Sequence, residues 1–158
     1  MEKENMASRN PEAFCGLYSG ACPVYLKRDH DWIVKKVLEE HGMALEDLHC
    51  DGCRTDVLSP SCQHCATRDC AKRKGLDSCS QCSEMPCEGI SGFGKVRPHG
   101  VEVVGNLMFL RDNGSEAWLA AQDAQWRCNS CGRVGSWYER TCEQCGAQLP
   151  AGYEAKST

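Results

Sequence analysis

The chain has 158 residues, a formal net charge of -4 and a pI near 5.7, and fourteen of its residues are cysteine. The acidic balance argues against broad electrostatic attraction to nucleic acid, no stretch is long and apolar enough to span a membrane, and residues 1–10 contain no apolar run typical of a signal peptide. We therefore expect a cytoplasmic protein without a membrane partner. In that reducing compartment, C-x2-C pairs are expected to bind metal rather than to form disulfides.

The N-terminal part contains one short cysteine segment and one predicted helix. Residues 14–23 hold Cys15 and Cys22 together with two glycines. Apolar residues at helical spacing then predict a helix over 29–41, with Asp31 near its start and Gly42 at its end. We expect this helix to pack rather than to take part in chemistry.

The densest cysteine pattern lies between residues 50 and 87, and three of its pairs have C-x2-C spacing. Its cysteines are Cys50, Cys53, Cys62, Cys65, Cys70, Cys79, Cys82 and Cys87. This spacing lets a tight turn present two thiolates to one metal ion, and Gly52 within the first pair suits a turn with positive φ. A short helix over 66–74, ended by Gly75, is predicted inside the segment.

The sequence leaves the grouping of these thiols open. Pairing by proximity makes one site of Cys50, Cys53, Cys62 and Cys65 and a second of Cys70, Cys79, Cys82 and Cys87. The alternative groups Cys15 and Cys22 with Cys50 and Cys53. Zinc is the expected occupant, and an iron–sulfur cluster is the alternative. The repeated spacing C-x2-C-x4-C favours a cluster, but it differs from the spacing of bacterial ferredoxins, which makes a cluster the less favoured occupant.

The segment after residue 87 is predicted to be a loop and then a helical hairpin. Three glycines and Pro98 predict a loop over 91–100. Apolar residues then indicate helices over 101–111 and 116–127, with Ser115 as the N-cap of the second.

The C-terminal part carries the most specific pattern in the chain. Two C-x2-C-G knuckles, formed by Cys128, Cys131, Cys142 and Cys145, are separated by ten residues. Such knuckles at the ends of a hairpin are typical of a zinc ribbon, in which four thiolates surround one tetrahedral ion. A unit of this size has almost no core, so metal binding is expected to supply its folding energy. A rubredoxin-like iron site is the alternative.

Other polar residues suggest no catalytic site. His49 and His64 lie beside cysteines and are expected to be solvated rather than to ligate metal. The basic run Arg68, Lys72, Arg73 and Lys74 is expected to offset thiolate charge, and a nucleic-acid surface is the less favoured alternative because no aromatic residues are interleaved. The sequence shows no catalytic triad, P-loop or dinucleotide-binding motif, and leaves open whether the protein is an enzyme.

The order of motifs resembles a family of bacteria and archaea called domain of unknown function 3795. The similar motifs are Cys-Gly-Leu-Tyr-Ser-Gly-Ala-Cys-Pro, Cys-Asp-Gly-Cys-Arg, Cys-x2-Cys-x4-Cys-Ala-Lys-Arg-Lys-Gly-Leu and Cys-x2-Cys-x3-Pro-Cys-Glu. The resemblance covers roughly residues 14–90, and longer members look similar through the C-terminal ribbon. Members commonly have a further cysteine where this chain has Ser19. The resemblance implies metal binding and no particular activity.

Together these patterns predict a small α+β metal-stabilised protein. We expect a cysteine-rich domain over residues 12–97, a helical-hairpin connector over 98–127 and a zinc ribbon over 128–150. All fourteen cysteines are candidate ligands for two to three zinc ions. The expected function is a metal-stabilised interaction module with a protein partner and no catalysis. Iron–sulfur redox or metal handling and nucleic-acid binding are the alternatives.

Overall fold

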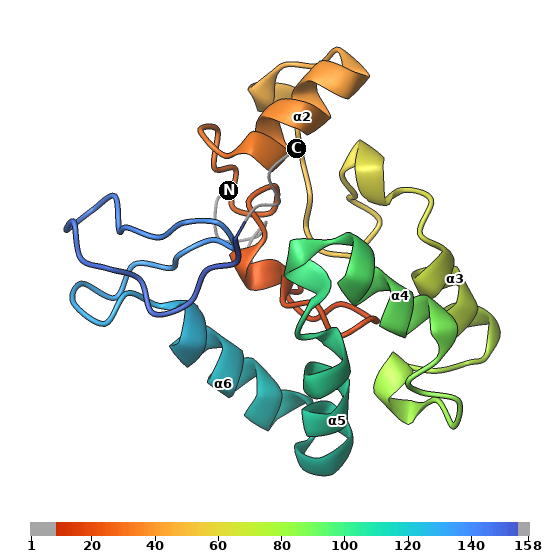
Figure 1. Cartoon of the computed structure of the whole chain (residues 1–158). Helices are drawn as coiled ribbons and strands as arrows, with labels where there is room; N and C mark the ends of the chain where they lie inside the picture. The colour runs from red at the N-terminus through yellow and green to blue at the C-terminus, as the bar shows by residue number, and fades with distance from the viewer. Residues whose placement is uncertain (1–8, 155–158) are drawn as a thin grey trace.

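The structure is a computed structural model that describes residues 9–154, and it is mostly helical (Figure 1). Within these residues the α-helices are α2 (Trp32–His41), α3 (Ala66–Arg73), α4 (Glu88–Val96), α5 (Val103–Asn113) and α6 (Ser115–Trp126). Short 3-10 turns occur at Ser19–Ala21, Leu45–Asp47, Pro60–Cys62, Cys79–Gln81 and Pro98–Gly100. None of the helices in the described part is long and apolar enough to cross a membrane.

The β component is smaller than the expected α+β class implies. Between residues 9 and 154 the β structure consists of isolated bridges, which join Glu12 to Tyr18, Arg127 to Val134 and Thr141 to Gln148. Each of the last two bridges closes one of the two C-terminal knuckles. The ribbon therefore forms from turns with one bridge each, because loops this short leave little room for paired strands.

Helix α2 begins and ends where local sequence signals place it. The carboxylate of Asp31 caps the N-terminus by accepting the backbone N–H of Ile33, and Gly42 ends the helix in the left-handed region at φ 56°. Val34 and Val37 are buried against Val24 and Leu48, which form a small separate core under this helix. The expectation that α2 serves packing is confirmed. The short helix predicted over 66–74 also forms, as α3.

The prediction of a loop over residues 91–100 is wrong. Helix α4 runs through most of this segment, and Ile90 on it is buried in the main core. A Cβ atom added at Gly94 would lie 2.9 Å from the carbonyl oxygen of Gly100, so this glycine permits a close approach between α4 and the turn that follows. The glycines thus reflect tertiary packing rather than a break in the helix.

Helices α5 and α6 form the expected hairpin, with one correction at their junction. The residue before α6 is Gly114, at φ 87°, and Ser115 is already the first helical residue. The Ser115 hydroxyl donates a hydrogen bond of 2.7 Å to the carboxylate of Glu12, which is buried in the N-terminal segment. Ser115 therefore connects the hairpin to the start of the chain instead of capping a helix.

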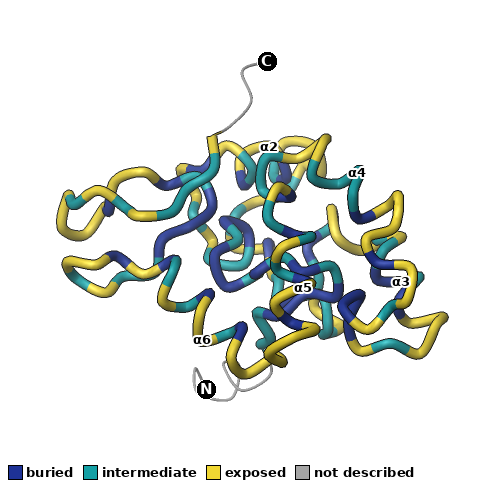
Figure 2. Tube along the Cα trace, turned by 60° about the horizontal axis from the view of Figure 1, so that its bottom comes forward, coloured by how far each residue is buried: buried dark blue, intermediate teal, exposed yellow. Residues whose placement is uncertain are grey.

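The main core combines residues from every part of the chain. Figure 2 shows buried segments gathered at the centre of the molecule and exposed tips on the C-terminal loops. The buried members of this core are Phe14, Tyr18, Ala21, Ala71, Cys79, Met85, Ile90, Val103, Leu107, Leu110, Trp118, Trp126 and Trp137. The N-terminal segment, the helical hairpin and the C-terminal ribbon thus share one apolar interior.

Candidate metal centres

The two C-terminal knuckles have nearly identical backbone geometry. In the first, the N–H of Gly132 donates to the carbonyl oxygen of Cys128 at 2.9 Å, and in the second Gly146 donates to Cys142 at 2.8 Å. Both glycines lie in the left-handed region, at φ 78° and 77°. Glycine adopts this conformation without steric cost, so the C-x2-C-G motif itself dictates the turn.

These turns bring the four ribbon cysteines, Cys128, Cys131, Cys142 and Cys145, to a common point. Their sulfur atoms all lie within 4.8 Å of one another. The Sγ atoms of Cys128 and Cys145 are 3.6 Å apart, and those of Cys131 and Cys142 are 3.5 Å apart. Four sulfurs bonded to one Zn²⁺ at about 2.3 Å are separated by about 3.8 Å. The arrangement can therefore hold one metal ion with little movement.

The backbone favours the thiolate form of two knuckle cysteines, one in each knuckle. The N–H groups of Cys131 and Ser130 point at the sulfur of Cys128 and lower the pKa of this thiol. Burial opposes ionisation of Cys142, but the N–H groups of Cys145 and Gln144 outweigh it, and the pKa of Cys142 is lowered as well. Because metals bind thiolates rather than thiols, these donors suit a metal site.

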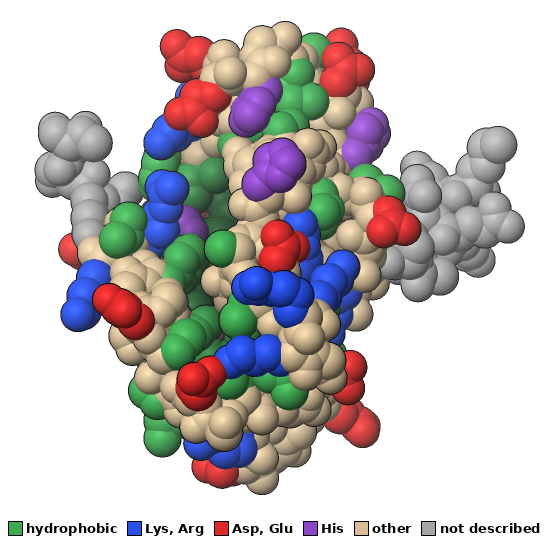
Figure 3. All heavy atoms as spheres, turned by 90° about the vertical axis from the view of Figure 1, so that its right-hand side faces the viewer, with side chains coloured by type: hydrophobic (Ala, Val, Ile, Leu, Met, Phe, Trp, Pro, Cys, Tyr) green, Lys and Arg blue, Asp and Glu red, His purple; other side chains and the backbone are tan. Residues whose placement is uncertain are grey.

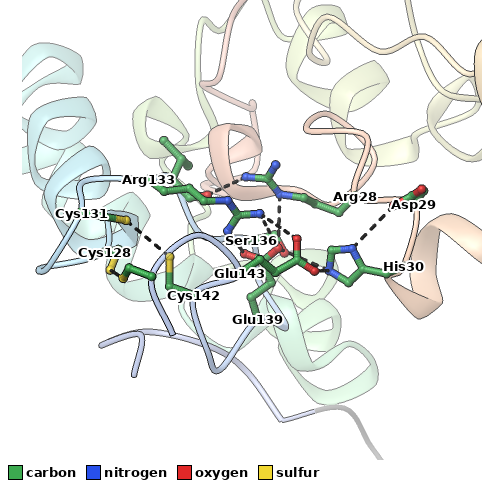
Figure 4. A network of polar contacts seen from close by, with 12 residues as sticks. Arg28, Asp29, His30, Cys128, Cys131, Arg133, Ser136, Glu139, Cys142 and Glu143 are labelled. Atoms are coloured by element: carbon green, nitrogen blue, oxygen red, sulfur yellow. Dashed lines mark hydrogen bonds and ion pairs between the residues drawn. The ribbon is translucent and has the colours of Figure 1, made fainter. Parts of the chain in front are cut away.

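A network of charged residues connects the ribbon to the N-terminal segment (Figure 4). Glu139 is buried and accepts hydrogen bonds from both terminal nitrogens of Arg133, at 3.0 and 3.2 Å. Arg28 approaches the same carboxylate, with its Nε 3.3 Å away, and donates to the carbonyl oxygen of Val134. His30 lies 3.2 Å from Glu143. His30, Glu139 and Glu143 also lie within 4.8 Å of one another, but the two arginines already pair with Glu139, so this group is a salt-bridge network.

Six other cysteines, termed here the cavity thiols, line one cavity of about 380 Å³. They are Cys15, Cys22, Cys50, Cys53, Cys62 and Cys65. The cavity is also lined by residues of α2, α3 and α4, including Ile33, Arg68 and Phe93. Figure 3 shows the face opposite the ribbon, where apolar side chains lie in a recess with Lys and Arg beside it. The structure thus places Cys15 and Cys22 on the same cavity as the first two C-x2-C pairs of the segment, a combination in neither sequence-based grouping.

The spacing of the cavity thiols differs from that of the ribbon. Apart from the ribbon cysteines and the His30 group, no three ligand atoms from His, Cys, Asp or Glu in residues 9–154 lie within 4.8 Å of one another. Burial raises the pKa of both the Cys15 and Cys22 thiols to about 12, with smaller effects from neighbouring cysteines. A buried thiol of this kind stays protonated unless a cation or metal offsets its charge.

The remaining four cysteines gather around Cys79. Burial raises the pKa of the Cys79 thiol to about 11, and Cys87, Cys70, Cys82 and Cys65 raise it further, so these four sulfurs lie near that of Cys79. The ammonium group of Lys74 lies 3.5 Å from the sulfur of Cys82 and also pairs with Glu84. Pairing by sequence proximity groups Cys70, Cys82 and Cys87 with Cys79, and it places Cys65 in the other site. The role of the Cys79 group as a metal site stays a prediction.

Two supporting residues of the cavity carry no signal that the sequence analysis could use. Arg68 is 7% exposed and donates to the carbonyl oxygens of Cys62 and Gln63, each at 2.9 Å. Ser59 is buried, and its hydroxyl has no hydrogen-bond partner among the described residues. In the sequence Arg68 is one of four basic residues and Ser59 one of many serines, so only the fold distinguishes them. His49 and His64 are exposed.

A comparison with protein families identifies the N-terminal part. The model of a family described as "Protein of unknown function (DUF3795)" matches residues 11–92, slightly more than half of the chain. The chain belongs to this family. The matched span contains the cavity thiols and the four cysteines around Cys79, and the ribbon cysteines lie beyond it. No curated protein and no solved structure matches the chain.

Proposed function

We propose that this protein is a metal-stabilised interaction module in which the ribbon cysteines hold one zinc ion. The observation that carries this proposal is the convergence of four sulfurs within 4.8 Å. A closed set of four thiolates is typical of structural zinc and leaves no open position for substrate. We also propose that the protein is cytoplasmic, as the sequence predicts.

The ribbon is suited to present a surface to a protein partner. Its base is fixed in the main core through Trp137, which is 5% exposed, whereas Asn129, Ser130 and Gln144 at the knuckle tips are exposed. In Figure 1 the two knuckle loops project away from the helices. A metal ion at their base would hold both tips rigidly, which reduces the entropy lost on binding a partner.

Zinc analysis of the full chain tests the metal part of this proposal. Wild-type protein and Cys145→Ser are purified in parallel, with Ser130→Ala as a matched control at an exposed position of the same knuckle pair. Cys145→Ser should contain one zinc equivalent less than the other two proteins, because three thiolates cannot close the site. Equal zinc content in all three proteins would refute a zinc ion at the ribbon.

A photo-crosslinking residue tests the partner surface. It is placed at the exposed Gln144 on a knuckle tip or, as control, at the exposed Asp112 on α5. A discrete cross-linked protein is expected from Gln144 alone, and it should disappear in the Cys145→Ser background. Equal cross-linking from both positions would count against the ribbon as the contact surface.

Nucleic-acid binding receives no support from the basic run. Arg68 is buried and bonded to backbone carbonyls, and Lys74 is paired with Glu84 and Cys82. Two of the four cations are therefore engaged within the protein. The iron–sulfur alternative, in contrast, is favoured by a specific feature, the cavity.

A further inference from the structure

The cavity thiols come from several parts of the N-terminal half and line one partly open space. Cys15 and Cys22 come from the N-terminal segment, Cys50 and Cys53 from the first C-x2-C pair, and Cys62 and Cys65 from the turn before α3. A volume of about 380 Å³ would be far too large for a single metal ion, which thiolates surround in direct contact.

The distances between these thiols exclude a preformed mononuclear site. No three of their sulfur atoms lie within 4.8 Å of one another, whereas all four ribbon sulfurs do. Within residues 9–154, hydrogen-bonded contacts between two cysteine sulfurs occur in the ribbon and not among the cavity thiols. A [2Fe–2S] cluster takes two thiolates on each iron, whereas a [4Fe–4S] cluster takes one. Well-separated thiolates therefore suit the four-iron cluster.

The surroundings of the cavity suit a negatively charged, sulfur-rich group. Backbone N–H groups are directed at the cavity sulfurs: that of Phe14 lies 3.4 Å from Cys53, and that of Arg68 lies 3.5 Å from Cys65. The Arg68 guanidinium is buried at the wall, where its nearest carboxylate, Asp69, is exposed and 4.0 Å away. A buried cation needs a counter-charge, and thiolates on an anionic cluster would provide one.

The hydroxyl of Ser59 adds an independent observation. Its oxygen is buried without a hydrogen-bond partner among the described residues, and the residue lines the cavity. An unpaired buried hydroxyl costs about 1–3 kcal/mol, so such groups normally have a partner. A cluster sulfur or ligating thiolate in the cavity would accept a hydrogen bond from this hydroxyl.

We propose that the cavity binds one [4Fe–4S] cluster through four of the six cavity thiols. The cluster would be a second metal centre, separate from the ribbon zinc and independent of it. Assembly of the oxidised [4Fe–4S]2+ cluster takes two ferrous ions, two ferric ions and four sulfides, so it needs no net electron transfer, and each ligating thiol releases a proton as it bonds to iron.

Reconstitution of the full chain tests this proposal. Anaerobic protein is incubated with ferrous and ferric iron in equal amounts and with sulfide, then desalted. We expect a broad visible absorption band, about four iron and four acid-labile sulfide per chain, and an electron paramagnetic resonance signal after reduction by dithionite. A colourless product, or iron without labile sulfide, would overturn the proposal.

Two matched triple variants locate the cluster. Cys50→Ser, Cys53→Ser and Cys62→Ser together leave three cavity thiols, too few for four-cysteine ligation. Cys128→Ser, Cys131→Ser and Cys142→Ser remove the same number from the ribbon. The cavity variant should lose the cluster, and the ribbon variant should keep iron and sulfide while losing zinc. Retention of the cluster in the cavity variant would refute its place there. Zinc is measured in the same samples, so that failure of the ribbon zinc site is seen separately from failure of the cluster site.

A milder variant keeps the test decisive if the cavity triple variant does not fold. Ser59→Ala removes one hydroxyl and no ligand. The reduction potential of the reconstituted cluster should fall, because hydrogen bonds to cluster sulfurs stabilise the reduced state. Ser130→Ala in the ribbon should leave the potential unchanged. An identical potential in wild type and Ser59→Ala would contradict a cluster in this cavity.

Discussion

The backbone N–H of Trp137 donates a hydrogen bond of 2.9 Å to the carbonyl oxygen of Ala21. The indole N–H of the same residue donates to the carbonyl oxygen of Tyr18 at 3.3 Å, and its ring stacks on His99 with centroids 4.5 Å apart. The ribbon is therefore held in place by more than its own four cysteines. It is joined to the N-terminal segment through one buried aromatic residue.

Replacing Trp137 by Ala should destabilise the whole protein by about 3–5 kcal/mol, because a large buried side chain leaves a cavity that the core only partly fills. The free energy of unfolding from denaturant titration measures this effect. Trp32→Ala is the matched control, since Trp32 is 40% exposed, and its loss should be clearly smaller. Equal losses in the two variants would show that Trp137 does not connect the ribbon to the core.

Replacing Glu139 by Gln should cost about 3 kcal/mol or more, because Arg28 and Arg133 would lose a shared, buried counter-charge. Glu143→Gln is the control, since its side chain is 53% exposed, and it should change stability by less than about 1 kcal/mol. Chemical denaturation at neutral pH distinguishes the two. If Glu139→Gln left the free energy of unfolding unchanged, the network would not stabilise the docked ribbon.

Glu139 also gives a pH dependence at the acid end. Burial opposes its ionisation, but Arg133, the N–H of Ser136 and Arg28 outweigh burial and hold its pKa below the usual value. Its contribution is therefore complete above the unfolded pKa of about 4.3 and is lost as pH falls below that value. The stability difference between wild type and Glu139→Gln should shrink on acidification below about pH 4.3. A constant difference would contradict the ion pairing.

His99 should make the protein less stable below neutral pH. Burial lowers the pKa of its imidazole to about 4, whereas the unfolded value is about 6.5. The unfolded chain binds the proton more readily, so stability is full above pH 6.5 and falls towards pH 4, by up to about 3 kcal/mol.

The measurement for His99 is the free energy of unfolding between pH 5 and 8, compared with His99→Phe. The variant keeps a ring against Trp137 but cannot titrate, so the wild type should lose stability relative to it as pH falls. His41→Phe, at an exposed position of α2, serves as control and should follow the wild type. Parallel curves for wild type and His99→Phe would rule out a buried, neutral imidazole.

Gly52 should be far less replaceable than other glycines with positive φ. A Cβ atom there would lie 1.9 Å from the backbone oxygen of Asn10, and φ is 109°. Gly42→Ala, at φ 56° with open space around it, should cost about 1 kcal/mol. Gly52→Ala should lower the melting temperature several times as much, and equal shifts would show that the first C-x2-C turn does not press against the N-terminal segment.

The parts of the fold that were predictable are those with local causes. Asp31 and Gly42 bound α2 because capping involves neighbouring residues, and the ribbon cysteines converge because Gly132 and Gly146 set each turn within a few residues. The family was confirmed by the family model, and the four ribbon cysteines lie close enough together to hold a metal ion, as the sequence predicts.

The parts that were not predictable depend on contacts between distant segments. The sequence predicts a loop at Gly94 because it does not reveal the close approach of the Gly100 backbone, which requires a glycine within the helix. The meeting of Cys15 and Cys22 with Cys62 in one cavity, and the burial of Arg68 at its wall, follow from packing of several segments. The domain boundaries and the assignment of all fourteen cysteines as ligands stay predictions.

In the proposed metal centre, the four ribbon thiolates close around one zinc ion. X-ray absorption at the zinc edge, recorded on the full chain as purified, tests it most directly. We predict four sulfur neighbours per zinc at about 2.3 Å and no nitrogen or oxygen ligand. Fewer than four sulfurs, or a nitrogen or oxygen neighbour near 2.0–2.1 Å, would contradict this account.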